Sequence, residues 1–361
     1  MLLRMGRVGK ALSIVRCEDS TIAPLDDSVR DVDDLGAPAL MQELGIDEAH
    51  PLRLLVPNIK SRKKTKTIRT EVLGIDLPRG AFFEVVPGND SATRIEIPEH
   101  LRVFVESPAL ALVQFSRELR SKAKQGSISM LETKLRLLEF CDECCGYYRR
   151  DAKKPRTGKI TYDRPNHPTN PATAEKIKSF LNELRFVDGL HLAREVANCV
   201  VDKLGSAMEG YLFHALTLPP RWGGLSMGKP LSNEQLQVSE GVWKKLKHKS
   251  LKPDIQWPEY RVLVEYLGDK EHASSSARKE DKNRMQDYAI ARYSPFPIMF
   301  DDVRNADALN KTAEMIAREL MRHGKEDELY RVRRYLKDDA FRDRQRTLIK
   351  TLLPPVTDCA V

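Results

Sequence analysis

The alternation of polar and apolar residues predicts a β-hairpin over residues 253–267. Two short runs of strand-forming residues flank a turn that contains Pro258 and Glu259. If the two strands pair symmetrically about Glu259 and Tyr260, Asp254 lies directly opposite Glu265. One face of the hairpin is then apolar and holds Ile255, Trp257, Val262, Val264 and Tyr266. The opposite face holds the two carboxylates together with Gln256, Leu263 and Leu267.

Two like charges that face each other across a sheet destabilise it unless a cation lies between them. The pairing of Asp254 with Glu265 beside an apolar face therefore favours a site for a hard divalent metal ion. The plainer interpretation is a solvated hairpin whose two acids meet Arg or Lys side chains.

Periodic segments surround the hairpin and predict one mixed α/β or α+β domain. The expected elements are a helix at 206–216, a strand near 235–242, a helix at 276–292, a strand at 295–300 and a helix at 313–324. Residues 326–350 are charge-dense and predict a basic helix.

The first half of the chain has a different pattern. Strand-like runs between residues 51 and 106 are separated by Pro and Gly and precede segments of helical spacing. Residues 151–172 are Pro-rich, polar and aperiodic. We therefore expect a smaller β-rich module with helices at 1–150, a linker or surface loop at 151–172, a second domain at 173–325 with its core at 201–325, and a basic helical tail at 326–361.

Composition indicates a soluble protein with a polyanionic partner. The 361 residues are 41% hydrophobic and 31% charged, with a formal net charge of +8 that favours nucleic acid as the partner. No apolar run is long enough to span a membrane, and the N-terminus lacks a signal-peptide core. Six thinly spread cysteines indicate a reducing cytoplasm, and the group Cys141, Cys144 and Cys145 predicts buried helix residues rather than a zinc site.

Other polar residues are candidates to join the carboxylate pair. Glu209, expected in the middle of its helix, is either an exposed helix residue or a third acid of the site. His272, which follows the hairpin, is either a helix cap or a site residue. Asp281, Arg284 and Tyr288 fall on one face of the next helix and point in a common direction, with a surface ion pair as the ordinary alternative.

A set of short motifs follows one another over about residues 195–325. They are Ser206-x-x-Glu209, a loop with Gly223, Gly224 and Pro230, Pro253-Asp254-x10-Glu265, Val264-Glu265-Tyr266-x-Gly268, His272 and Asp281-x-x-Arg284. In this order they resemble the PD-(D/E)XK nuclease superfamily, and within it the branch of very-short-patch-repair-like endonucleases. The resemblance implies a restriction-endonuclease-like fold with a mixed central sheet flanked by helices. The N-terminal module is loosely similar to actinobacterial abortive-infection antitoxin-like proteins through LPRGAFFEV, ESPALALVQFS and CCGYY.

The resemblance implies metal-assisted hydrolysis of phosphodiester bonds in DNA, in defence or repair, with Mg²⁺ or Mn²⁺ as cofactor. Asp254 and Glu265 would be metal ligands, and Glu209 would either complete the carboxylate cluster as a third ligand or hold a metal-bound water. His272 would complete the catalytic set, either by donating a proton to the leaving oxygen or by activating water. Arg284 would contact a phosphate or fix the neighbouring aspartate of its helix.

One position departs from the pattern of the superfamily. Lys, or in this branch Asp, usually stands two residues after the strand glutamate, and Leu267 stands there in this chain. Lys270 and Lys279 are candidates to supply the missing cation and to contact nucleic acid. The alternative function is a catalytically decayed nuclease fold that acts as a nucleic-acid-binding or antitoxin-like regulator.

Basic residues far from the hairpin extend the expected footprint on nucleic acid. The run at 60–66 includes Arg62, Lys63 and Lys64, which either contact phosphates or form a solvated loop. The tail at 326–350 is a candidate docking segment for an acidic protein partner, and a homodimer stays open.

Overall fold

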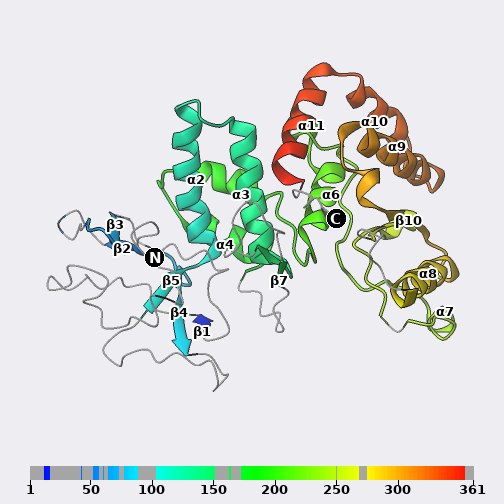
Figure 1. Cartoon of the computed structure of the whole chain (residues 1–361), viewed down its shortest axis with the longest axis horizontal. Coiled ribbons are helices and arrows are strands. Elements are labelled where there is room, and N and C mark those ends of the chain that lie inside the picture. The colour runs from blue at the N-terminus through cyan, green and yellow to red at the C-terminus, as the bar shows by residue number, and fades with distance from the viewer. Residues whose placement is uncertain are drawn as a thin grey trace. The chain divides into compact units, whose positions relative to one another are not determined.

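The computed structural model describes residues 12–16, 42, 52–56, 60, 64–72, 77–87, 103–150, 162–163, 172–248, 250–267 and 275–353. The protein is mixed α/β, as expected, and divides into two compact units (Figure 1). The first unit comprises Met1–Lys124, Arg149–Asp163 and Thr169–Asn198. The second comprises Gln125–Tyr148, Arg164–Pro168 and Cys199–Val361.

These units differ from the expected boundaries, because packing rather than chain order decides them. Helix α3 (Met130–Cys145), expected in the first module, packs against α11 (Asp339–Leu352) in the second unit. Helices α4 (Ala174–Glu183) and α5 (Leu190–Ala197), expected in the second domain, pack on α2 (Pro108–Lys124) in the first unit. A boundary near residue 150 therefore does not separate the two cores.

The first unit contains short strands in its N-terminal part. One antiparallel sheet has the spatial order β1 (Leu12–Arg16), β4 (Phe82–Pro87) and β5 (Val103–Glu106). A parallel pair consists of β2 (Leu52–Val56) and β3 (Ile68–Val72), and an antiparallel pair of β6 (Arg149–Arg150) and β7 (Tyr162–Asp163). Strands β2, β3, β4 and β5 confirm strand-like runs expected between residues 51 and 106, whereas residues 88–102 and most of the expected linker lie outside the described residues.

The second unit holds the predicted hairpin together with most of the helices. After α3 its helices are α6 (Ala207–Thr217), α7 (Glu240–Trp243), α8 (Ser275–Ile290), α9 (Ala306–Arg322), α10 (Glu328–Leu336) and α11, with short 3-10 helices η4 (Pro220–Trp222), η5 (Pro258–Tyr260) and η7 (Phe300–Asp302). Its strands are β8 (Ile255–Trp257), β9 (Val262–Tyr266) and β10 (Ser294–Ile298). No helix in the described part of the chain is long and apolar enough to cross a membrane.

The hairpin has the predicted register. Strand β9 lies in the centre of a three-stranded sheet, antiparallel to β8 and parallel to β10. Ile255 pairs with Val264, and Trp257 pairs with Val262. One further step along this register sets Asp254 opposite Glu265, as the symmetric turn predicts.

The prediction of a strand near residues 235–242 is wrong. The chain is instead extended at 231–236, where it runs antiparallel to 251–256. Leu231 and Gln256 exchange two N–H···O bonds of 2.8 and 2.9 Å, and the N–H of Leu236 donates to the carbonyl of Leu251. Residues 240–243 form the single turn of α7, and their apolar side chains pack with Leu236 and Val238 in one cluster. A loop and a helical turn therefore produced the strand-like spacing.

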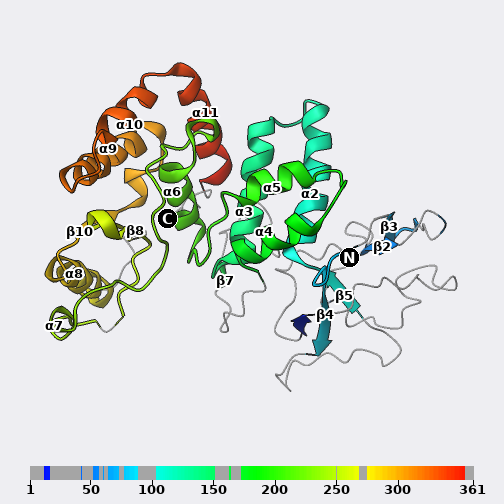
Figure 2. The ribbon, with the colours of Figure 1, turned by 180° about the vertical axis from the view of Figure 1, so that it is seen from behind.

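Both faces of the hairpin are buried. The apolar face is as predicted, with Ile255, Trp257, Val262 and Val264 all buried. The opposite face is covered by α8, because Leu263 and Tyr288 belong to one core cluster. Figure 2 shows α8 next to β10, the strand that pairs with β9. The carboxylate of Glu265 is therefore enclosed between the sheet and this helix.

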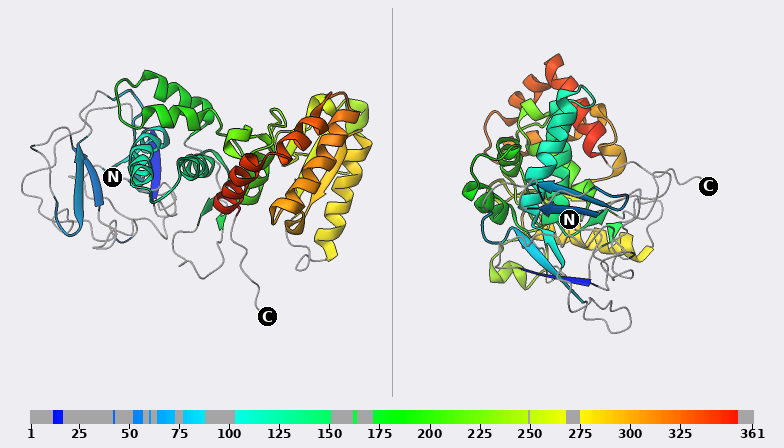
Figure 3. Two further views of the ribbon diagram at one scale, coloured as in Figure 1. Left: turned by 90° about the horizontal axis from the view of Figure 1, so that it is seen from above. Right: turned by 90° about the vertical axis from the view of Figure 1, so that its left-hand side faces the viewer.

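The predicted basic tail is helical, but its helices are part of the second unit's core. Helix α10 packs against α9 (Figure 3). Helix α11 packs against α3, α6 and η4. Their buried residues include Leu329, Val332, Phe341, Leu348 and Leu352. Arginines of these helices form ion pairs with nearby acids, among them Arg333 with Glu314 and Arg346 with Asp343. The segment is therefore part of a packed unit rather than a separate tail, and its docking to an acidic partner stays a prediction.

Candidate functional site

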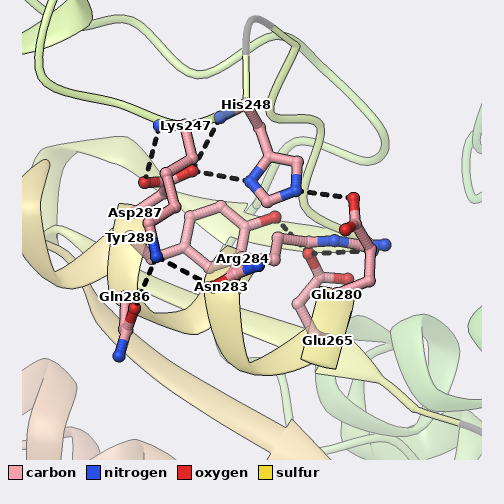
Figure 4. A network of polar contacts seen from close by, with 9 residues as sticks. All are labelled: Lys247, His248, Glu265, Glu280, Asn283, Arg284, Gln286, Asp287 and Tyr288. Carbon is pink, nitrogen blue, oxygen red and sulfur yellow. Dashed lines mark hydrogen bonds and ion pairs between the residues drawn. The ribbon is translucent and has the colours of Figure 1, made fainter. Parts of the chain in front are cut away.

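Glu265 is the central acid of the candidate site. It lies in β9, and only 1% of its surface is exposed. The hydroxyl of Tyr288 donates to its Oε1, and Nη1 of Arg284 lies 4.0 Å from the same oxygen (Figure 4). Burial raises the pKa of Glu265, and the Tyr288 hydrogen bond and the Arg284 charge offset this only in part. The expectation that Arg284 and Tyr288 point at one place is confirmed.

Asp254 faces Glu265 from the start of the neighbouring strand. Its Oδ2 accepts the backbone N–H of Tyr266 at 2.6 Å, and its side chain shares a hydrogen bond with Glu265. Burial raises its pKa well above the usual range, and the charges of Glu209 and Glu265 raise it further. Asp254 and Glu265 therefore act as one coupled pair of acids.

Glu209 is the third acid, and its place in the helix differs from the expected one. Ser206 caps α6 by accepting the N–H of Glu209 at 3.1 Å, so Glu209 lies in the first helical turn rather than in the middle. Its Oε2 accepts the N–H of Gly205 at 2.7 Å and the side-chain amide of Asn233 at 2.8 Å. The Ser-x-x-Glu motif is thus a helix-capping device as well as a candidate site element.

The three acids form one electrostatic cluster. Asn233 connects Glu209 to the hairpin, because its side-chain amide donates to Glu209 and its backbone N–H donates to the carbonyl of Pro253, next to Asp254. Glu209 is itself buried, and its charge raises the pKa of both Asp254 and Glu265. Among the described residues, no group of three His, Cys, Asp or Glu side chains is already spaced to hold a metal ion. The cluster therefore consists of one coupled pair with a third acid beside it.

The remaining residues predicted for the site either lie at some other place in the structure or fall outside its described part. Lys279 is an exposed residue of α8, and Asp281 is partly buried one turn before Arg284. Leu267 is also partly buried, and its N–H donates to the carbonyl of Ile298 at 2.9 Å. Four predicted residues lie outside the described part of the chain, namely His272, Lys270, Arg62 and Lys63. Lys64 is exposed in the first unit.

A second polar network on α8 escaped the sequence interpretation. The ring of His248 lies between Asp287, 2.6 Å from Nδ1, and Glu280, 2.7 Å from Nε2 (Figure 4). Asp287 is fully buried and also accepts the backbone N–H groups of Lys247 and His248. Because both ring nitrogens face carboxylates, His248 is best satisfied as an imidazolium. The network ties the segment after α7 to the helix that carries Arg284 and Tyr288.

The pKa values in this network depart from their ordinary values in opposite directions. The hydrogen bond to Asp287 raises the pKa of His248, burial opposes this, and Glu280 adds to the rise. Burial acts to raise the pKa of Asp287, but the hydrogen bonds from His248 and Lys247 outweigh it and the pKa is lowered. Asp287 was the residue that could have revealed this network in the sequence, because an acid at a buried position of a helix needs a hydrogen-bond partner.

We expect the His248 network to make the second unit less stable at high pH. The folded pKa of His248 lies above the unfolded value of about 6.5, so its contribution is complete below that pH and is lost as pH rises through the folded pKa. Urea unfolding followed by tryptophan fluorescence suits this test, because all three tryptophans, Trp222, Trp243 and Trp257, lie in the second unit.

The stability difference between wild type and His248→Asn should therefore shrink between pH 6 and 9. A difference that stays constant over this range would contradict the proposed linkage. His191→Asn removes an exposed histidine of the first unit and serves as the matched control.

The prediction that the three neighbouring cysteines are buried helix residues is confirmed. Cys141, Cys144 and Cys145 are buried in α3, and burial raises the pKa of the Cys141 thiol well above its ordinary value. Beside them Asp142 and His214 form a buried pair, with 2.7 Å between Oδ2 and Nε2. This pair joins α3 to α6 and so supports the helix that carries Glu209.

Comparison with known proteins gives no significant match among protein-family models, curated proteins or solved structures. The interpretation of the site therefore depends on the residues of this chain.

Proposed function

We propose that the second unit is a metal-dependent endonuclease that hydrolyses phosphodiester bonds in DNA. The observation that carries this proposal is the cluster of three acids in which Glu209 and Glu265 are buried and Asp254 is partly buried. Gathering buried like charges costs free energy, which a bound cation offsets. Among the side chains that the structure describes, Arg284 contributes one positive charge near Glu265, which is fewer than the charges of three ionised acids.

The donor set suits a hard divalent cation. Carboxylate oxygens are the ligands that Mg²⁺ and Mn²⁺ prefer, and Asp254 and Glu265 would hold the ion with Glu209 beside them. Mg²⁺ keeps several waters and needs only one or two carboxylates, so a site without three preformed ligands is compatible with it. When bound, the ion would stabilise the charge that develops on the phosphoryl and leaving oxygens.

Backbone and side-chain donors hold each acid in place. The N–H of Tyr266 fixes Asp254, and the hydroxyl of Tyr288 fixes Glu265. The N–H of Gly205 fixes Glu209. Acids anchored on strands and on a helix start keep their positions while substrate binds, which lowers the reorganisation cost of catalysis.

The order of elements around the acids gives further support. A helix, an extended segment, the two hairpin strands, α8 and a parallel strand follow one another, and this is a mixed sheet flanked by helices. The resemblance to PD-(D/E)XK nucleases implies such an arrangement. The net charge of +8 favours a polyanionic substrate.

A nucleic-acid-binding regulator without catalytic activity is the second candidate. Leu267 favours it, because an apolar side chain occupies the position at which the resembled nucleases carry Lys or Asp. Such a protein would bind DNA with a strong dependence on salt, since phosphate contacts release counterions, and would need no divalent ion.

Incubation of the full chain with supercoiled plasmid separates the two candidates. We expect nicked and linear products with Mg²⁺ or Mn²⁺ and none with EDTA. Salt-sensitive DNA binding without cleavage in either ion would contradict the nuclease and support the regulator.

A further inference from the structure

We propose that Arg284 supplies, from helix α8, the positive charge that the resembled nucleases place on the strand two residues after the glutamate. This role rests on the proposed function. It gives Arg284 a part in the chemical step, through direct contact with the phosphate that is attacked, rather than in general affinity for DNA.

The placement of α8 brings Arg284 to the acids. Tyr288, one turn further along the helix, donates its hydroxyl to Oε1 of Glu265 and so fixes how the helix faces the strand. Arg284 precedes Tyr288 by four residues and therefore lies on the same side of the helix. Its Nη1 is 4.0 Å from the same carboxylate oxygen (Figure 4).

The guanidinium of Arg284 is suited to a second, anionic partner. At 4.0 Å the contact with Glu265 is ionic and too long for a hydrogen bond. The side chain of Arg284 is 38% exposed, whereas that of Glu265 is 2% exposed, so the pair has one buried end and one end open to solvent. A guanidinium carries five N–H donors in a planar fork that matches two phosphate oxygens.

The strand does not provide a cation at the usual position. Leu267 follows Glu265 by two residues, and its N–H continues the pairing with β10 through the carbonyl of Ile298. Strand alternation therefore places an apolar side chain on the carboxylate side of the sheet. Lys279, one of the lysines considered for this task, precedes Arg284 by five residues and lies on a different side of the helix.

Charge placed beside the reacting phosphate acts mainly on the transition state, where negative charge is redistributed over the phosphoryl oxygens. Loss of one such donor typically lowers the rate of the chemical step about 100- to 1,000-fold. Loss of an ordinary phosphate contact instead weakens binding. Cleavage rate and duplex affinity therefore distinguish the two roles.

The experiment compares single-turnover cleavage and duplex affinity, measured in Ca²⁺, for wild type, Arg284→Ala, Arg284→Gln and Arg284→Lys. We expect Arg284→Ala and Arg284→Gln to cleave about 100-fold more slowly or worse, with affinity changed less than about threefold, and Arg284→Lys to retain part of the rate. Lys282→Ala removes an exposed positive charge from the same helix and should match wild type. Circular dichroism checks that each variant is folded.

The double variant Leu267→Lys/Arg284→Ala tests whether the two positions are interchangeable. Recovery of at least about tenfold in rate over Arg284→Ala is expected, because the new lysine restores charge beside Glu265. A double variant that cleaves no faster than Arg284→Ala would show that a lysine at position 267 cannot replace Arg284, and would overturn the proposed equivalence of the two positions. An Arg284→Gln protein that cleaves like wild type, or one whose affinity falls in step with its rate, overturns the role of Arg284 alone. A wild-type protein with no metal-dependent cleavage overturns the proposed function itself.

Discussion

Replacement of Asp254 by Asn is expected to lower metal-dependent cleavage by about 1,000-fold or more and to make the metal-free protein more stable. The loss of activity follows because the ion would lose a charged ligand, and several kcal/mol of transition-state stabilisation correspond to about three powers of ten in rate. Single-turnover cleavage measures the first effect, and urea unfolding in EDTA, followed by tryptophan fluorescence, measures the second.

The gain in stability has an electrostatic origin. The Asn side chain can still accept the N–H of Tyr266, while the like charges on Glu209 and Glu265 lose a neighbour that repels them. Two charges about 4 Å apart near a protein surface interact with roughly 4 kcal/mol, so we expect a gain on the order of 1–4 kcal/mol.

The gain should also depend on pH. The folded pKa of Asp254 lies well above its unfolded value of about 4, so the folded wild type binds more protons than the unfolded chain. Stability of the wild type in EDTA therefore falls as pH rises above about 4 toward the folded pKa. The advantage of Asp254→Asn should grow between pH 5 and 8.

Glu259→Gln is the matched control, because Glu259 is an exposed acid in η5 of the same hairpin. Both its cleavage rate and its stability should equal those of wild type. An Asp254→Asn protein that cleaves within a few-fold of wild type, or that is less stable than wild type in EDTA, would contradict the account of the acidic cluster.

The second large effect is expected at Glu328, which is fully buried between two cations. Lys325 lies 3.0 Å from its Oε1, and Arg331 bonds to its Oε2. Lys325 also donates to the carbonyl of Met227, which accepts the indole N–H of Trp257 in β8 at 2.8 Å. Glu328 therefore compensates the charge of Lys325, which connects the start of α10 to the loop that contains Met227.

Glu328→Ala should lower the free energy of unfolding of the second unit by about 3–5 kcal/mol, because it leaves buried positive charge without a partner. Burial already lowers the pKa of Lys325, which shows how poorly solvated this charge is. Urea unfolding by tryptophan fluorescence measures the change. Glu326→Ala, an exposed acid two residues earlier, should change stability by less than about 0.5 kcal/mol. A Glu328→Ala loss no larger than that of this control would show that the cluster contributes little.

Local rules predicted the hairpin and part of the site. The centre of the turn sets the register of the two strands, so the pairing of Asp254 with Glu265 follows from the sequence once Glu259 and Tyr260 are placed at that centre. Helical spacing placed Arg284 and Tyr288 on one face, and their shared contact with Glu265 agrees with this.

Long-range packing explains what the sequence did not predict. His248 and Asp287 are 39 residues apart, and nothing in their local patterns indicates that they meet. The spacing near residues 235–242 resembled a strand, because apolar residues of a loop and of α7 fill one cluster. The last helices look like a solvated basic tail in sequence, since most of their charges lie on the faces opposite the buried Leu and Phe residues.

Whether the acidic cluster binds a divalent metal ion can be measured by calorimetric titration of Mn²⁺ into the metal-free full chain. We expect saturable binding to wild type that is lost in Asp254→Asn and unchanged in Glu259→Gln. Equal binding of Mn²⁺ by wild type and Asp254→Asn, or no binding by a folded wild type, would contradict it.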